Sequence, residues 1–159
     1  MIILTGSLFL LIFGCIPVYN HTLSFLVWIA GDNDLEQFIF QDLKEMIGNP
    51  SWINVFALVD YRSSSDTLYR VEEGLIPLET FDEINSGDPV VLSSFLNAYR
   101  GEDLSLLVIW NHGDWWRGES QKQVKGVAYD FTDLDFFTIS EIKSVLRVLP
   151  LRYWASMPV

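Results

Sequence analysis

Residues 23–34 read LSFLVWIAGDND, and this stretch indicates the fold class. Its first eight residues form a continuous apolar run, which is typical of a strand buried on both faces. Gly31-Asp32-Asn33 interrupts the run, and we interpret Asn33 and Glu36 as a capping box that starts a helix. Gly48 and Pro50 end that helix. Its apolar face is predicted to consist of Leu35, Phe38, Ile39, Leu43, Met46 and Ile47.

The same alternation of apolar runs and amphipathic segments continues along the chain. Strands are predicted at residues 53–61, 67–72 and 104–110. One helix is predicted to be capped by Asp88 and to end at Gly101, and another to begin with a Thr138–Glu141 capping box and to end at Pro150. Strands that alternate with helices in this way predict an α/β fold with a mostly parallel sheet.

The composition limits the number of domains and the class of partner. The chain has 159 residues, half of them hydrophobic, so we expect one compact domain. Cys15 is the only cysteine, which excludes a disulfide scaffold. The net charge of −11 repels nucleic acid phosphates and attracts cationic peptides or metal ions. We therefore expect no nucleic acid partner.

The first 22 residues differ from the rest of the chain, because Met1–Val18 are apolar and the first charged side chain is Asp32. This length and composition favour a signal segment or a membrane anchor. The LIFGC run that ends at Cys15 resembles a bacterial lipoprotein box, so Cys15 is a candidate for lipidation, and a plain uncleaved anchor is the alternative. We expect the protein to be exported and to be either membrane-anchored or extracellular.

Polar residues follow the 104–110 strand, where the sequence reads NHGDWW from Asn111 to Trp116. Ligands of open parallel sheets bind beyond the carboxyl ends of the strands. His112 is therefore a candidate catalytic base, and a histidine that only satisfies local hydrogen bonds is the alternative. Asn111, Trp115 and Trp116 are candidates for a substrate cleft, and the tryptophan pair is equally consistent with a cover for the sheet edge.

Five landmarks occur in order along the chain. They are Trp28–Glu36 with its Asp-Asn-x-Leu-Glu turn, Asn54–Asp60, Gly87-Asp88-Pro89, Leu107–Gly113 with its Asn-His-Gly motif, and Gly126–Asp130 followed by Phe137–Ile142. This ordered set resembles the clostripain-like cysteine peptidases, a family with a caspase-type fold, and the resemblance covers about residues 23–150. An ordered set of this kind is far more specific than any single motif.

The resemblance implies a cysteine endopeptidase in a caspase-like three-layer sandwich. It implies that His112 is the general acid/base, that Gly113 belongs to the oxyanion and substrate loop, and that the substrate is a peptide or protein with basic residues. The family's nucleophile lies in an Asp-Ala-Cys motif on the next strand, and this chain has no such motif in frame. The resemblance therefore implies the N-terminal part of the domain, inactive as written.

The last residues read YWASMPV from Tyr153 to Val159, and their codons can encode a different peptide in another reading frame. Read from the third base of the Tyr153 codon, the nucleotides must begin with Leu-Gly, and the Met157 and Pro158 codons force an alanine at the fifth position. A TCN codon for Ser156 allows Phe, Leu, Ile or Val at the third position. The permitted bases then spell Leu-Gly-Phe-Asp-Ala-Cys. We interpret residues 151–159 as an out-of-frame tail and expect the strand after the last helix to be absent, which leaves the sheet incomplete at its C-terminus.

Two acidic groups raise the question of a metal. Asp32 with Asp34, and Asp130 with Asp133 and Asp135, offer oxygen ligands for Ca²⁺. Neither group has EF-hand spacing, and we therefore favour solvated loop ends or helix caps over a Ca²⁺ site. We predict no metal site and no cofactor. Besides an endopeptidase, the sequence leaves open a catalytically dead remnant and a non-catalytic exported binding protein or lipoprotein.

Overall fold

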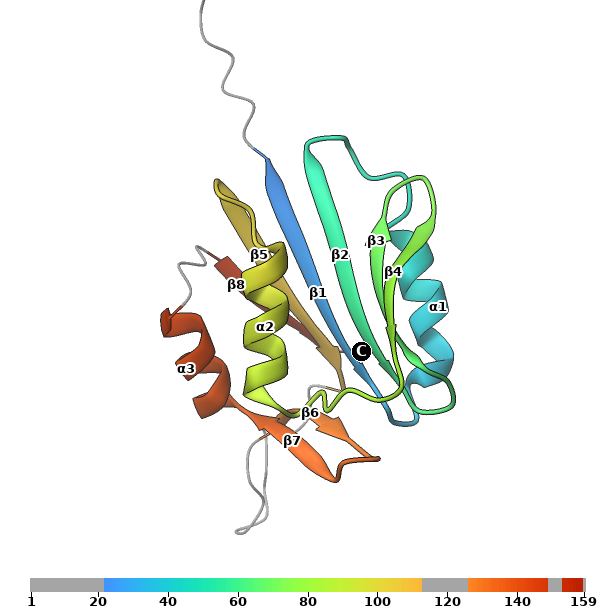
Figure 1. Ribbon diagram of the computed structural model, residues 1–159, viewed down its shortest axis with the longest axis vertical. Helices are drawn as coiled ribbons and strands as arrows, with labels where there is room; N and C mark the ends of the chain where they lie inside the picture. Colours follow the sequence, from blue (N-terminus) through green and yellow to red (C-terminus); the bar gives the residue numbers. More distant parts are fainter. Residues whose placement is uncertain (1–21, 113–125, 149–152, 159) are drawn as a thin grey trace, which may run out of the picture.

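The computed structural model describes residues 22–112, 126–148 and 153–158. A six-stranded sheet in the order β4-β3-β2-β1-β5-β8 forms its centre (Figure 1). The parallel strands are β1 (Leu23–Gly31), β2 (Ile53–Tyr61), β5 (Leu104–Asn111) and β8 (Tyr153–Pro158). Two antiparallel strands, β3 (Asp66–Val71) and β4 (Leu75–Phe81), extend the sheet beyond β2.

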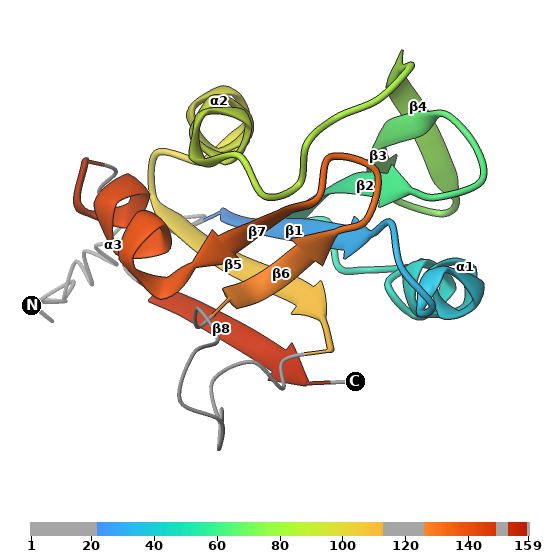
Figure 2. The same ribbon diagram turned by 90° about the horizontal axis from the view of Figure 1, so that it is seen from below.

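Helices cover both faces of this sheet, as Figure 2 shows. On one face lie α2 (Pro89–Tyr99) and α3 (Ile139–Val148), and on the other lies α1 (Glu36–Glu45). Side chains alternate along β1, so Leu26 and Trp28 join the core under α2 while Val27 and Ile29 join the core under α1. The two cores confirm the three-layer α/β sandwich.

A short hairpin stands apart from the main sheet and closes over one end of it. It consists of β6 (Gly126–Asp130) and β7 (Asp135–Thr138), and its turn contains Leu134 at a positive φ of 53°. Phe137 is fully buried in the core under α2 and α3. The sequence pattern did not predict β4, β6 or β7 as strands, because these segments lack the long apolar runs of the central strands.

Two of the three predicted caps are confirmed. Asp88 accepts a hydrogen bond from the Val90 N–H at 2.7 Å at the start of α2. The Thr138 hydroxyl accepts from the Glu141 N–H at 3.1 Å, and the Glu141 carboxylate accepts from the Thr138 N–H at 2.9 Å. Both arrangements satisfy N–H groups that have no partner inside the helix.

The capping box expected at Asn33 and Glu36 is wrong. Asn33 forms an Asx turn by accepting from the Leu35 N–H at 2.9 Å, and α1 begins only at Glu36. The Glu36 carboxylate instead accepts hydrogen bonds from the N–H and hydroxyl of Ser63. Phe38, expected on the apolar face of α1, is 42% exposed. The Glu36 carboxylate therefore bonds to the loop after β2 instead of closing a capping box with Asn33.

The tail also differs from its expectation. We expected β5 to lack a neighbour on this side, but residues 153–158 form β8 and pair with β5 from Leu106↔Tyr153 to Asn111↔Pro158. Tyr153 and Trp154 are residue types that favour extended backbone, and the unpaired edge of β5 offers hydrogen-bonding groups to any strand that can reach it. The segment fills the strand position that follows α3.

No helix among the described residues is long and apolar enough to cross a membrane. The expected leader at residues 1–22 lies, except for Thr22, outside the described residues.

Candidate active site and acidic cluster

The carboxyl ends of three parallel strands meet at one edge of the sheet. In the registers of these strands, Ala30 of β1 lies opposite Asp60 of β2, and Ile29 lies opposite Trp110 of β5. Asp32, Asp60 and His112 therefore emerge at the same edge, although they are far apart in the sequence. In a parallel sheet this edge is the expected place for chemistry.

His112 is held by its neighbour in the chain and by the end of β1. The Asn111 side chain donates to the Ala30 carbonyl at 2.9 Å and accepts from the His112 N–H at 2.7 Å. The imidazole Nε2 lies 2.6 Å from Oδ1 of Asp34. This contact fixes the direction of the ring and leaves Nδ1 available to a reacting group.

The electrostatics of this pair follow from the same contact. The hydrogen bond from His112 lowers the pKa of Asp34 below its usual range, and the charges of His112 and Arg62 act in the same direction. The imidazole is 34% exposed and the Asp34 side chain 74% exposed, so water or a substrate can reach both. The arrangement suits a histidine that accepts and returns a proton at a partly exposed position.

The other predicted site residues fall into two groups. Asn111 is only 2% exposed and uses both ends of its side-chain amide inside the protein, so it positions His112 and does not line an open surface. Gly113, Trp115, Trp116 and the lipidation candidate Cys15 lie outside the described residues.

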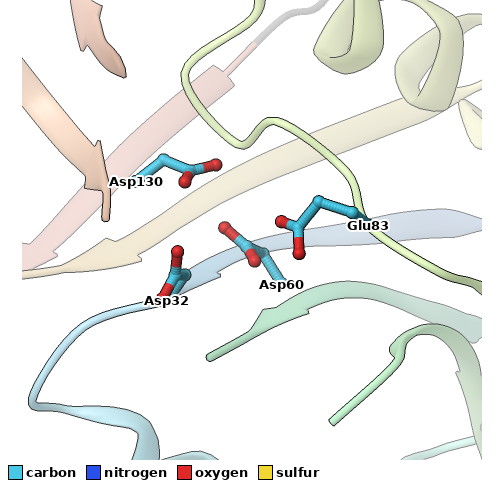
Figure 3. Close-up of side chains that lie close together, drawn as sticks. All are labelled: Asp32, Asp60, Glu83 and Asp130. Atoms are coloured by element: carbon cyan, nitrogen blue, oxygen red, sulfur yellow. The ribbon is translucent and has the colours of Figure 1, made fainter. Parts of the chain in front are cut away.

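A second group of side chains gathers beside the histidine edge. Figure 3 shows four carboxylates from four segments turned toward a common centre. One oxygen from each lies within 4.8 Å of the others. They belong to the residue after β1, the end of β2, the loop between β4 and α2, and the end of β6, and they are Asp32, Asp60, Glu83 and Asp130.

Hydrogen bonds from the surrounding backbone fix two of the four carboxylates, Asp32 and Asp130. Asp32 Oδ2 accepts from the Thr132 N–H. Asp130 accepts from the N–H groups of Asp133 and Ser86, both at 2.9 Å. The β6–β7 turn is thereby tied to the end of β1 and to the loop before α2.

The concentration of carboxylates raises their pKa values. Burial raises the pKa of Asp60 to about 9. The nearby Ser86 hydroxyl works against this shift, and the negative charges of Asp130, Asp66 and Asp32 add to it. Burial and the same neighbouring charges raise the pKa of Glu83 to about 7. The pKa of Asp130 is raised for the same reasons. Several carboxylates held this close cannot all carry a charge without a counter-ion or shared protons.

The acidic groups noted in the sequence are rearranged by the fold. Asp32 and Asp130 come together, whereas Asp34 faces His112 and Asp135 accepts from Asn85 at 2.9 Å. Asp60 and Glu83 were missed as members of the cluster. One signal for Asp60 is present in the sequence: a charged residue at the end of an otherwise apolar strand needs a reason to be buried.

Comparisons with known proteins give a consistent result. The profile of the Clostripain family matches residues 27–152. A secreted C11 cysteine protease from Bacteroides thetaiotaomicron, solved with an irreversible peptide inhibitor, is 25% identical with a TM-score of 0.66; the match covers 85% of this chain and 42% of that one. A B. fragilis cysteine protease is 24% identical with a TM-score of 0.50 over 64% of this chain and 98% of that chain.

An inactive zymogen C11 protease from Parabacteroides distasonis shares the fold at 21% identity and a TM-score of 0.52, over 62% of this chain and 33% of that one. No curated protein sequence matches the chain. The chain thus spans less than half the length of the B. thetaiotaomicron enzyme that it resembles.

Proposed function

The chain belongs to the clostripain family, and we propose that it carries the histidine half of the catalytic site of a cysteine endopeptidase. In this proposal His112 is the general acid/base, Asp34 orients its ring, and Gly113 belongs to the loop that receives the substrate carbonyl. A thiolate from the following strand attacks the scissile carbonyl, and His112 returns a proton to the leaving amine.

The observation that carries this proposal is the register of β8 on β5. Pro158 of β8 lies opposite Asn111, the residue before His112. The shifted reading frame places the cysteine of Leu-Gly-Phe-Asp-Ala-Cys at the end of this same segment, because its six codons begin in the Tyr153 codon and run to the Val159 codon. A thiol at that point lies on the strand next to His112, at the same edge of the sheet. A nucleophile and its base need this kind of proximity.

We propose that residues 151–159 are an out-of-frame tail and that the 159-residue chain alone does not cleave peptides. The family match ends at residue 152, where the shifted reading begins to spell the nucleophile motif. A base without a thiolate contributes little to peptide hydrolysis by the covalent route.

We also propose a substrate class and a cellular location, namely peptides with basic residues and export from the cytoplasm. A net charge of −11 favours peptides with Arg or Lys, and the family resemblance implies cleavage after basic residues. The apolar leader favours export to a membrane-anchored or extracellular state, and the B. thetaiotaomicron relative is described as secreted.

Restoring the reading frame at the Tyr153 codon tests the proposal. The repaired protein, with its downstream half translated, is expected to cleave Arg- or Lys-containing peptides and to lose this activity with thiol reagents. His112→Ala is expected to lower kcat/KM by a factor of about 10²–10⁴ or more. His21→Ala, which changes the only other histidine, is the matched control and is expected to leave activity intact.

Two results would contradict this assignment. Cleavage by the 159-residue chain that survives Cys15→Ser would place the nucleophile elsewhere. A repaired protein that folds, exposes its thiol and still cleaves no peptide would instead support the non-catalytic exported binding protein. The DNA sequence through the Tyr153 codon gives the first check, because it shows directly whether Asp-Ala-Cys is encoded in the shifted frame.

A further inference from the structure

A cation–π contact joins two loops at the edge of the sheet that carries His112. Arg62 directly follows β2, and its guanidinium carbon lies 5.1 Å from the centre of the Phe131 ring, which directly follows β6. The Phe131 ring meets the Tyr129 ring edge to face, with the two ring centres 4.8 Å apart. Arg62 is exposed and Phe131 is 43% exposed, so the stacked guanidinium lies at the surface.

Hydrogen bonds fix the backbone on both sides of this contact. The N–H groups of Tyr61 and Ser63, which flank Arg62, each donate to a carboxylate, at 2.6 Å and 2.9 Å. The Phe131 N–H donates to the Asp32 carbonyl at 3.2 Å. Both loops therefore have their own anchors, and the aromatic ring holds a guanidinium whose backbone is already in place.

Arg62 lacks the acidic partner that another exposed arginine has. Arg70 forms an ion pair with Glu72 at 2.6 Å. Arg62 forms no ion pair with any residue that the structure describes, although the chain contains 21 acidic side chains. The N–H donors of a guanidinium lie in a planar fork that matches a carboxylate, and stacking on a ring face leaves the rim of this fork accessible. The Arg62 guanidinium is thus fixed in place and able to accept a carboxylate from outside the chain.

Arg62 lies near the histidine region. Asp34 contacts His112 at 2.6 Å, and the pKa of Asp34 is lowered first by this hydrogen bond and further by the charge of Arg62. Phe131 is hydrogen-bonded to Asp32, two residues before Asp34. Among the described residues, Arg62 is the only basic one beside the carboxyl ends of β1 and β2. The other described basic residues lie on α1, on β3, after α2 and on α3, and they are Lys44, Arg70, Arg100, Lys143 and Arg147.

We propose that Arg62, held on Phe131, is a specificity-determining residue that binds an acidic side chain of the peptide substrate beside the scissile bond. The inference rests on the proposed endopeptidase function and narrows its substrate class to peptides with an Asp or Glu near the cleaved basic residue. The net charge of −11 favours basic residues wherever else the peptide faces this surface. A single position that prefers Glu to Lys therefore requires a local cation, and the same guanidinium repels a second basic side chain there.

Peptide binding to the 159-residue chain tests this site without any need for catalysis. The probes are capped alanine peptides with one Arg, in which a Glu, Gln or Lys is moved one residue at a time on either side of the Arg. At one position, the Glu peptide is expected to bind about three- to tenfold more tightly than the Gln peptide, and the Lys peptide more weakly than either. NMR spectra follow the Arg62 Nε–H signal, which is expected to shift with this Glu peptide and not with its Gln counterpart.

Three variants and one control separate a specific site from a general effect of charge. Arg62→Gln is expected to abolish the difference between the Glu and Gln peptides. Arg62→Lys keeps the charge without the planar fork, so it is expected to retain only part of the preference. Phe131→Leu keeps an apolar side chain without the aromatic face and is expected to weaken the preference. Arg100→Gln changes an exposed arginine between α2 and the start of β5, and as the matched control it is expected to bind as the unaltered chain does.

The repaired protein gives a second readout, because a residue that binds the substrate away from the reacting atoms acts on KM. The Glu peptide is expected to have a lower KM than the Gln peptide at the same position, with a similar kcat, and Arg62→Gln is expected to remove this difference.

Two outcomes would overturn the role of Arg62. The first is a 159-residue chain that binds the Glu and Gln peptides alike at every position, or binds neither at millimolar concentration. The second is an equal loss of preference in Arg62→Gln and Arg100→Gln, which would indicate a diffuse effect of surface charge. Cleavage by the repaired protein without a preference for Glu would refute this inference alone. A folded repaired protein that cleaves no peptide, while the 159-residue chain still prefers Glu, would refute the endopeptidase assignment alone.

Discussion

The edge of the sheet carries two different polar regions side by side. The acidic cluster at the ends of β1, β2 and β6 is mostly buried, and all four of its carboxylates belong to the described residues. The histidine region at the end of β5 is partly exposed, and the loop that follows His112 lies outside the described residues. The described residues therefore contain the whole acidic cluster. Of the histidine region they contain His112 and the Asp34 carboxylate that orients its ring.

This difference indicates which properties belong to the fold and which to a completed enzyme. Changes in the cluster should alter stability in the 159-residue chain itself. Changes to His112 itself and to Asp34 should alter stability only slightly, and changes to His112 become visible as activity once a thiol is supplied. Four measurements in the 159-residue chain test the division, beginning with the largest expected effect.

The cluster should make the chelator-treated chain less stable as pH rises. The pKa of Asp60 is raised from 3.8 to about 9, so between these values the folded state holds a proton that the unfolded state has lost. Stability is therefore full below about pH 4, falls as pH rises and levels off above about pH 9. Asp60→Asn should flatten this dependence and raise stability above pH 7 by several kcal/mol, as measured by urea unfolding in chelator.

Glu83 and Asp66 contribute in the same direction, with pKa values raised to about 7 and about 6. Glu79→Gln should therefore show the full pH dependence of the unaltered chain, and it is the control. A stability that rises with pH from 4 to 9 would mean that the cluster is charged and balanced in the folded state without added cation.

Loss of core packing at the end of β1 should have the next largest effect on stability. Ile39 of α1 is 0% exposed and lies so close to the end of β1 that a Cβ on Gly31 would clash with its Cδ1. Ile39→Ala should lower the free energy of unfolding by about 2–5 kcal/mol because it leaves a cavity. Phe38→Ala, one residue earlier and 42% exposed, should cost less than about 1 kcal/mol.

Equal losses in the two variants, measured by urea unfolding, would contradict the placement of the α1 face. They would restore the sequence-based prediction that Phe38 belongs to the core.

The capping and strand patterns show how much of this could be predicted from the sequence. The second strand has the bounds that its apolar run predicts, and Asp88 and Thr138 cap their helices because the partners lie within three residues. Asn33 fails because its side chain bonds within its own loop, to the Ala30 carbonyl and the Leu35 N–H, before the helix begins. Local interactions are therefore predictable where nothing distant competes for the same groups.

The acidic cluster could not be predicted in this way, because it is assembled from four segments. The sequence placed Asp32 and Asp130 in two separate groups of nearby aspartates, and the partners that they find in the fold depend on the register of β1 with β2 and on the path of the loop after β4. Periodicity carries neither kind of information. The place of His112 was predictable because it follows a long apolar strand directly, and the contact with Asp34 was not, since it crosses from β5 to the end of β1.

Removal of the Asn111 side chain, which positions His112, should lower the free energy of unfolding less than a cavity in the core does. Asn111 donates to the Ala30 carbonyl and accepts from the His112 N–H while nearly fully buried. Asn111→Ala leaves both groups without this partner and should cost about 1–3 kcal/mol, measured by urea unfolding. In the repaired protein the same variant should lower kcat more than it raises KM, because it moves the base. An unchanged kcat with a normal fold would show that the backbone alone positions His112.

The smallest effect concerns Asp34, and it tests whether the histidine contact exists in solution. Asp34 is exposed, and its pKa is lowered chiefly by the hydrogen bond from His112. His112→Gln removes the imidazolium charge while keeping an amide that can donate, so the pKa of Asp34 should rise part of the way toward 3.8; His112→Ala should raise it further. NMR titration of the Asp34 carboxyl measures both, and Asp88, a carboxylate that caps α2 away from His112, is the internal control. Because Asp34 is open to water, neither change should alter global stability measurably. If the Asp34 titration is the same in both variants and in the unaltered chain, the two side chains do not meet, and His112 is oriented by Asn111 alone.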